Sequence, residues 1–319
     1  MPGFTTHYIF GMKAYNDMPF TPLKHTIAKY RWLYQLGLQG PDMFFYNIPI
    51  LRHRDYRNVG SYMHEHKVNA FFECCLRRIG TIRSRQQQEE AISYLAGFIN
   101  HYIADSICHP YVYGRIGYPV DAPTSMHHGM HAHLENELDA ILLWKYKKKK
   151  PSEFNQTATI CLNGQEIQFI SHFLASCINE TYYPITYRNN FQVTPAMVHR
   201  SIWALRFGCR TLSDKNGKKK FGIAQVESIF VNHPVASAKM VTDSVTDYRS
   251  SCNLNHEAWS NPWDPTRVST ASFVDLFHET LDKCSRVYAL LNSAVTDNMP
   301  LDKQDLSPLL AELGNESYH

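Results

Sequence analysis

The sequence of 319 residues lacks several features that would place a protein in a narrow class. It has no apolar run of about 18 residues, which a membrane-spanning helix needs. Its start has no basic segment followed by an apolar one, which a signal peptide needs. Its eight cysteines form no CxxC pair, which argues against a cysteine-rich zinc knuckle. We therefore expect a cytoplasmic protein with reduced thiols, and export by another route stays open.

The chain also has little net charge, +3 at neutral pH with histidine neutral. That value argues against extensive wrapping of nucleic acid, although not against a local basic patch. Hydrophobic residues make up 44% of the chain and charged residues 19%, so it can form a sizeable core. Histidine is abundant, with 17 residues, and most of them lie in the first 135 positions beside aspartate and glutamate. Imidazole and carboxylate are the ligands of zinc and similar metals.

Periodicity and capping signals predict an all-α, mainly helical fold. The expected helices span residues 22–38, 63–78, 89–108, 125–146, 167–180, 194–212 and 272–292. Pro110 is expected to end the third of them. The pair Asn163-Gly164 between alternating apolar residues predicts a short β-hairpin insertion. The lysines of 145–150 fit a helix C-terminus and a solvated linker, with contact to a phosphate-rich surface as the alternative.

No internal repeat interrupts this pattern, so we expect one domain over residues 1–319. Its metal-binding half would span residues 1–146 and its helical C-terminal half residues 150–319. The tail at 300–319 is expected to be flexible.

The stretch "NHYIADSICHPY" places His101, Asp105 and His109 four residues apart. In a helix this spacing puts the three side chains on one face, within roughly 80°. An ionised aspartate among aromatic residues is costly unless it is paired or bound to a cation. The stretch therefore predicts either a metal site or a histidine–aspartate hydrogen bond in a polar seam of the core.

A second stretch, "HHGMHAHLENELDAILL", contains two overlapping HxxxE pairs. Helical geometry places His131 and Glu135 at the edge of the apolar face, and His133 and Glu137 on the opposite side. We expect the first pair to point inward and the second to face water. Asp139 is expected to accept a hydrogen bond from a ligating imidazole.

Other candidates are scattered upstream. Asp42 follows Gly-Pro at a turn and by itself is most simply a turn or cap residue. His64 and His66 point about 200° apart on a helix, so only one of them can face a given site. His7 alone would be an ordinary histidine near the start of the chain.

Together these stretches resemble the zinc-dependent phospholipase C family, which is related to the trinuclear-zinc phospholipases C of bacilli and more distantly to single-strand-specific zinc nucleases. The resemblance rests on "YLAGFINHYIADSICHP" followed by "HAHLENELD". The segments "THYIFG", "GLQGPDMFFY", "GSYMHEHKVNAFF" and "LNHEAWSNPWDP" occur in the same order, so the resemblance covers nearly the full chain. It implies a multi-helix domain of the phospholipase C/nuclease type.

The resemblance implies a cluster of two or three zinc ions. One zinc is implied at Asp42, His64, His101 and Asp105. Asp105 would bridge to a second zinc that His7 also binds. A third zinc would take His109, His131 and Glu135.

Two departures from the family pattern bear on these assignments. His109 comes four residues after Asp105, whereas in the related enzymes the corresponding histidine comes six residues after the bridging aspartate. The related mature enzymes also bind zinc through their own N-terminal amine. Here His7 lies six residues from Met1, so Met1 or Pro2 would have to fold back. The zinc beside His7 is therefore expected to be weaker or completed by water.

The implied activity is hydrolysis of a phosphodiester, with Asp42 as a ligand that also orients or deprotonates the attacking water. The implied substrate is a phospholipid or another small phosphodiester, with possible peripheral contact to a membrane. Aromatic residues near these segments could hold a choline headgroup or a base, or could simply pack in the core: Tyr8, Phe44, Phe45, Tyr46 and Tyr62. Two alternatives stay open, a zinc nuclease or phosphatase and a non-catalytic protein in which zinc only holds helices together.

Overall fold

The structure is a computed structural model that describes residues 3–46, 59–182, 192–211 and 247–316, with a few isolated positions between 214 and 245. Its helices are α1 (Phe4–Asp17), α2 (Pro22–Lys29), α3 (Arg31–Gly37), η1 (Gly40–Tyr46), α5 (Val59–Glu65), α6 (Val68–Thr81), α7 (Arg85–Arg115), α8 (Ser125–Lys147), η2 (Pro151–Glu153), η3 (Gln156–Thr159), α9 (Gly164–Thr181), α11 (Pro195–Thr211), α13 (Tyr248–Ser251), α14 (Phe273–Thr296) and α15 (Ser307–Leu313). The strands β1 (Trp259–Asn261) and β2 (Asp264–Ser269) form an antiparallel pair. The prediction of a mainly helical fold is confirmed. None of the described helices is long and apolar enough to cross a bilayer.

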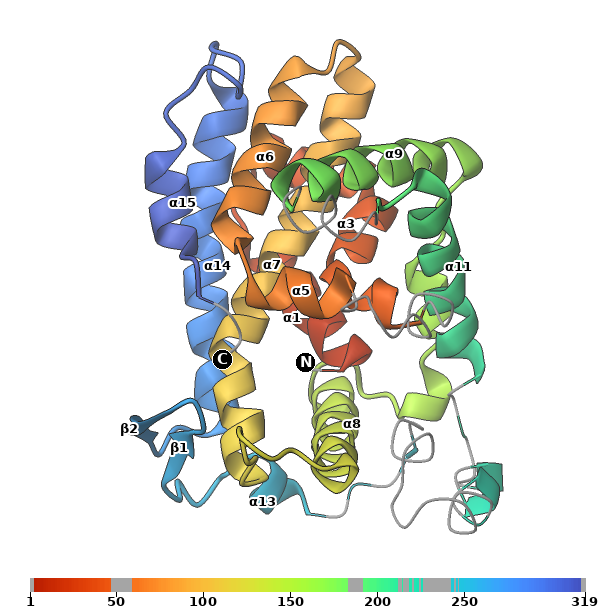
Figure 1. The fold of residues 1–319 in the computed structure, drawn as a ribbon, viewed down its shortest axis with the longest axis vertical. Coiled ribbons are helices and arrows are strands. Elements are labelled where there is room, and N and C mark those ends of the chain that lie inside the picture. The colour runs from red at the N-terminus through yellow and green to blue at the C-terminus, as the bar shows by residue number, and fades with distance from the viewer. Residues whose placement is uncertain are drawn as a thin grey trace.

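Helix α7 is the centre of the architecture. It contacts α1, α2, α3, α6, α8, α9 and α14, and in Figure 1 it runs between α14 on one side and α3 on the other. Its buried residues are nearly continuous from Ala91 to Val112, as expected for a helix covered on several sides. The polar residues of "NHYIADSICHPY" are therefore held inside the protein, where each must find a partner.

The expected stop at Pro110 is wrong, because α7 continues through this proline to Arg115. Proline removes one backbone hydrogen bond from a helix interior. The two residues that follow, Tyr111 and Val112, are fully buried against the rest of the protein. We infer that this packing outweighs the loss of one hydrogen bond.

Two predicted helices are each divided in the structure. The one expected over 22–38 breaks at Tyr30 into α2 and α3, and the Tyr30 carbonyl there accepts a hydrogen bond from Ser93 Oγ. The one expected over 63–78 breaks between α5 and α6, where Lys67 takes a left-handed conformation with φ 51°. The first break precedes Asp42 and the second follows His64, so the two breaks enclose the part of the chain that carries both residues.

The hairpin expected at Asn163-Gly164 is also wrong. Asn163 instead caps α9, accepting a hydrogen bond from the Glu166 backbone N–H while the Glu166 side chain accepts from the Asn163 N–H. This reciprocal capping box stabilises a helix start and outweighs the turn preference of Asn-Gly. The strands that do form, β1 and β2, lie in the connector before α14. At the other end of α14, the segment expected to be flexible contains α15, whose Leu309 and Leu313 are buried.

Helices α3 and α7 approach each other through two glycines. A Cβ added to Gly37 would lie 2.1 Å from the Tyr94 carbonyl oxygen, and one added to Gly97 would lie 2.1 Å from the Tyr34 carbonyl oxygen. The two backbones are therefore in direct contact, with no space for a side chain between them. This contact sets the distance between α7 and the chain that leads into η1.

Replacing Gly97 with alanine is expected to destabilise the fold by about 1–3 kcal/mol or more, because the added methyl group meets backbone atoms that cannot rotate away. Chemical denaturation of the variant measures this loss. Gly164→Ala is the matched control, since nothing lies within 4 Å of a Cβ at that position. Equal stability of Gly97→Ala and Gly164→Ala would contradict the close approach of α3 and α7.

Candidate metal centre

The centre of the site is Asp105 on α7. Its side chain is 3% exposed and lies on the face that also carries His101 and His109. Oxygen Oδ1 is 3.2 Å from His7 Nε2 and 3.9 Å from His109 Nδ1. Oxygen Oδ2 is 3.2 Å from the Nε2 atoms of both His64 and His101. The two oxygens of this one carboxylate thus face different histidines, which is the arrangement that a ligand bridging two metal ions needs.

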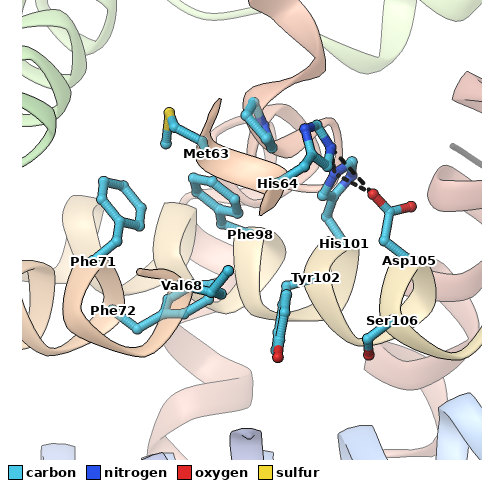
Figure 2. A pocket seen from close by; sticks show the side chains of 11 residues that line it. Met63, His64, Val68, Phe71, Phe72, Phe98, His101, Tyr102, Asp105 and Ser106 are labelled. Carbon is cyan, nitrogen blue, oxygen red and sulfur yellow. Dashed lines mark hydrogen bonds and ion pairs between the residues drawn. The ribbon is translucent and has the colours of Figure 1, made fainter. Parts of the chain in front are cut away.

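The rings of His64 and His101 are fixed by backbone carbonyl groups. His64 Nδ1 is 2.7 Å from the Gly60 oxygen, and His101 Nδ1 is 3.1 Å from the Leu38 oxygen. Each Nδ1–H donates to its carbonyl, which leaves each Nε2 facing the site, as in most metal-binding histidines. The two Nε2 atoms are 3.3 Å apart, and Figure 2 shows both rings directed at the Asp105 carboxylate. His66, the alternative to His64, has a side chain that is 41% exposed.

The turn before Asp42 depends on Gly40. Gly40 has φ +45°, and a Cβ there would lie 2.3 Å from Cδ2 of His101. Only glycine satisfies both the left-handed backbone and the close approach to this ring. The turn delivers Asp42 from η1 to the site, with its Oδ1 3.3 Å from His64 Nε2 and 3.9 Å from His101 Nε2. Asp42 is therefore more than the simple turn residue that its sequence context alone indicates.

His7 enters from α1, a helix that the sequence pattern did not predict. Its ring is fully buried and stacks on His101, with centroids 4.1 Å apart. The start of α1 is held by Asp139, which accepts hydrogen bonds from the backbone N–H groups of Thr5 and Thr6 at 3.0 and 2.7 Å. The expected contact of Asp139 with an imidazole is thus replaced by a contact with the first turn of α1, where N–H groups lack helical partners. The predicted contribution of Met1 or Pro2 lies outside the described residues.

A third group forms where α7 meets α8. His109, His131 and Glu135 bring their ligand atoms within 4.8 Å of one another, and His131 Nε2 lies against Glu135 Oε1. Tyr113, one turn after His109 on α7, packs edge-on against the His131 ring with centroids 4.4 Å apart. The sequence pattern contained no sign of this contact.

The second HxxxE pair only partly follows the expectation. The His133 side chain is 52% exposed, as expected. Glu137 was expected to face water, but it is buried and accepts a hydrogen bond from Ser251 Oγ of α13. A helical wheel could not show this, because α13 covers that side of α8.

The donor atoms fit a metal better than they fit one another. Both ring nitrogens of His7, Oδ1 of Asp42 and both oxygens of Asp105 are buried, and no hydrogen bond to another described residue satisfies them. Such atoms are costly inside a protein unless they bind a cation. Three groups of metal-binding geometry result, His7–His101–Asp105, Asp42–His64–His101 and His109–His131–Glu135. Mixed imidazole and carboxylate donors of this kind suit zinc.

The electrostatics of the site follow from burial and from these pairs. Burial alone would lower the pKa of His64, but the carboxylates of Asp105 and Asp42, whose oxygens lie 3.2 and 3.3 Å from its Nε2, raise it to about 9. Burial would raise the pKa of Asp105, yet the neighbouring His101 and His7 hold it well below its ordinary value. Burial, together with His7, lowers the pKa of His101. The Asp105 carboxylate is therefore ionised at neutral pH and His64 carries a proton when no metal is bound.

A small pocket opens beside this cluster. His64, His101, Asp105 and Ser106 form one side, and apolar side chains line the rest, namely Met63, Val68, Phe71, Phe72, Phe98 and Tyr102 (Figure 2). Of the aromatic residues suggested by the sequence, Phe45 stacks on His64 at 5.7 Å and Phe44 is fully buried in the core. Tyr8 packs on Phe154 instead, with centroids 5.2 Å apart. The apolar lining of the pocket therefore comes mainly from α6 and α7, whose aromatic residues carry no distinguishing signal in the sequence.

Comparison with known proteins agrees with this geometry. Residues 6–186 match the family described as zinc-dependent phospholipase C, and these residues include every member of the three groups. The chain belongs to the zinc-dependent phospholipase C family. No curated protein and no solved structure matches it.

Zinc binding is expected to release a proton from His64, because a ligand imidazole must be neutral and the pKa of this one is about 9. Zinc affinity should therefore rise about tenfold per pH unit from neutral pH and level off above pH 9. Calorimetry of zinc titration in buffers with different ionisation enthalpies counts the protons released.

His64→Gln removes this proton and should lower both zinc affinity and proton release. His66→Gln is the matched control two residues away, and it should leave both unchanged. A wild-type zinc affinity that does not vary between pH 7 and 9 would contradict the assignment of His64.

Proposed function

We propose that the protein is a zinc-dependent phosphodiester hydrolase of the phospholipase C type. The observation that carries the proposal is the meeting of three donor groups around Asp105, in a chain that belongs to this family. His7, Asp42, His64, His101 and Asp105 would hold two of the ions. His109, His131 and Glu135 would hold the third.

When bound, zinc supplies positive charge for the phosphate oxygens and lowers the pKa of water toward 7. Asp42 is the residue we assign to the water. Its side chain is 9% exposed, and its buried Oδ1 lacks a hydrogen-bond partner among the described residues. A carboxylate in this position can orient the attacking water and accept a proton from it.

A phospholipid or another small phosphodiester is the favoured substrate. The pocket beside His101 and Asp105 is lined mostly by apolar side chains, but its space of about 20 Å³ admits only a water-sized group, so the preference rests on membership of the zinc-dependent phospholipase C family. The modest net charge of +3 gives no general basis for binding a polyanion. These features place a nuclease activity second.

A purely structural role for zinc is the alternative from another class. A structural site usually saturates zinc with four protein ligands, most often cysteine and histidine. Here the donors are imidazoles and carboxylates, one carboxylate is shared, and that carboxylate, Asp105, lines a pocket. This arrangement supports open sites that leave a position for water.

Asp42→Ala should lower the hydrolysis of phosphatidylcholine and of a chromogenic phosphodiester by about 100-fold or more, because it removes the group that orients and deprotonates water. The helical circular dichroism spectrum should be kept. Steady-state rates in zinc-supplied buffer measure the effect.

Asp121→Ala is the control, since Asp121 is an exposed aspartate outside the three groups. The structural role would be favoured if the wild-type protein binds zinc but hydrolyses none of these esters. If Asp42→Ala hydrolyses these esters at the wild-type rate, the role of Asp42 is overturned, while zinc-dependent hydrolysis by the protein is not.

A further inference from the structure

Helix α11 exposes a face that the metal centre does not use. Trp203 and Phe207 are one turn apart and stack with their rings 5.3 Å apart and nearly parallel. Their exposed fractions are 62% and 53%. Among the described residues, no other stacked pair of aromatic rings has both side chains more than half exposed. Packing in the core does not explain either ring.

The charged side chains that α11 itself carries beside this pair have one sign. Arg200, Arg206 and Arg210 lie within about 60° of Trp203 on the helical wheel, and the helix from Pro195 to Thr211 contains no aspartate or glutamate. Arg200 and Arg210 are exposed. The opposite face is apolar and buried through Val198, Ile202, Leu205 and Cys209. The exposed face thus presents two aromatic rings among cations.

The same helix lies directly against the segment that carries Asp42. Helix α11 packs on η1, and a Cβ added to Gly208 would lie 2.3 Å from the ring of Tyr46. A surface bound to the outer face of α11 would therefore lie about one helix diameter, roughly 10 Å, from η1. In Figure 1, α11 stands at one edge of the molecule with no helix outside it in this view.

We propose that the outer face of α11 binds the surface of an anionic phospholipid membrane. Tryptophan and phenylalanine settle at the boundary between headgroups and acyl chains, and arginines pair with lipid phosphates. An aromatic face without arginines would suit a second copy of this chain equally well, but the three arginines, on a helix without acidic residues, favour lipid phosphate. This inference rests on the proposed function in one respect: it takes the lipid surface to be the source of the substrate.

Sedimentation with vesicles tests the proposal. The full-length wild-type protein should bind vesicles that contain phosphatidylglycerol and phosphatidylcholine, bind pure phosphatidylcholine less, and dissociate as salt rises. The double variant Trp203→Ala/Phe207→Ala should bind about tenfold or more weakly. A triple variant with Arg200, Arg206 and Arg210 changed to glutamine should lose the preference for phosphatidylglycerol. Its affinity for these vesicles should fall about fivefold for each arginine removed.

The matched control is Phe20→Ala/Val268→Ser, which removes two exposed apolar side chains that are 99% and 63% exposed elsewhere on the molecule. It should bind like the wild type. Equal binding by all variants would overturn the proposal, as would no binding by the wild type. A wild-type dimer that both α11 variants dissociate, without vesicle binding, would assign the face to a second copy instead.

Hydrolysis of a water-soluble chromogenic phosphodiester, measured on the same samples, separates this proposal from the proposed function. Both α11 variants should keep the wild-type rate on the soluble ester and lose rate on vesicles. Vesicle binding without hydrolysis of either ester would refute the proposed function and leave the surface in place. Hydrolysis of the soluble ester without vesicle binding would refute the surface and leave the function in place.

Discussion

The structure depends on one buried carboxylate, Asp105, at the junction of four histidines. An ionised aspartate in a helix that is covered on several sides is costly without compensating charge. Its two oxygens face His7 and His109 on one side and His64 and His101 on the other. These histidines come from α1, α5 and α7, so helices far apart in the sequence meet at a single residue.

The rest of the architecture can be understood as support for that junction. The glycine contact of α3 with α7 and the left-handed Gly40 bring Asp42 to the site. Asp139 on α8 binds the first N–H groups of α1, and this contact positions His7. Asp139 is buried, and burial raises its pKa to about 6. Ligands and anchors thus occupy neighbouring turns of the same helices.

Much of this arrangement is predictable from the sequence, for identifiable physical reasons. Ligands four residues apart on a helix share a face, so helical spacing alone groups His101, Asp105 and His109. The inward direction of His131 and Glu135 follows from the apolar positions beside them. Residues such as His7 and Asp42 carry no local signal, and only the resemblance to a family links them to the others.

What the sequence could not show depends on tertiary contacts. Pro110 lies inside α7 because buried neighbours hold the helix together on both sides of it. Asn163-Gly164 starts a helix because Glu166 completes a capping box. Glu137 is buried because α13, which is remote in sequence, covers it. Local preference was real in each case, and a competing contact outweighed it.

Anomalous diffraction recorded on both sides of the zinc absorption edge, from crystals grown with zinc, tests the central claim most directly. We predict zinc density within about 2.0–2.2 Å of ligand atoms of His101 and Asp105, and a separate peak among His109, His131 and Glu135. Zinc density confined to surface histidines, or none at Asp105, would contradict the account.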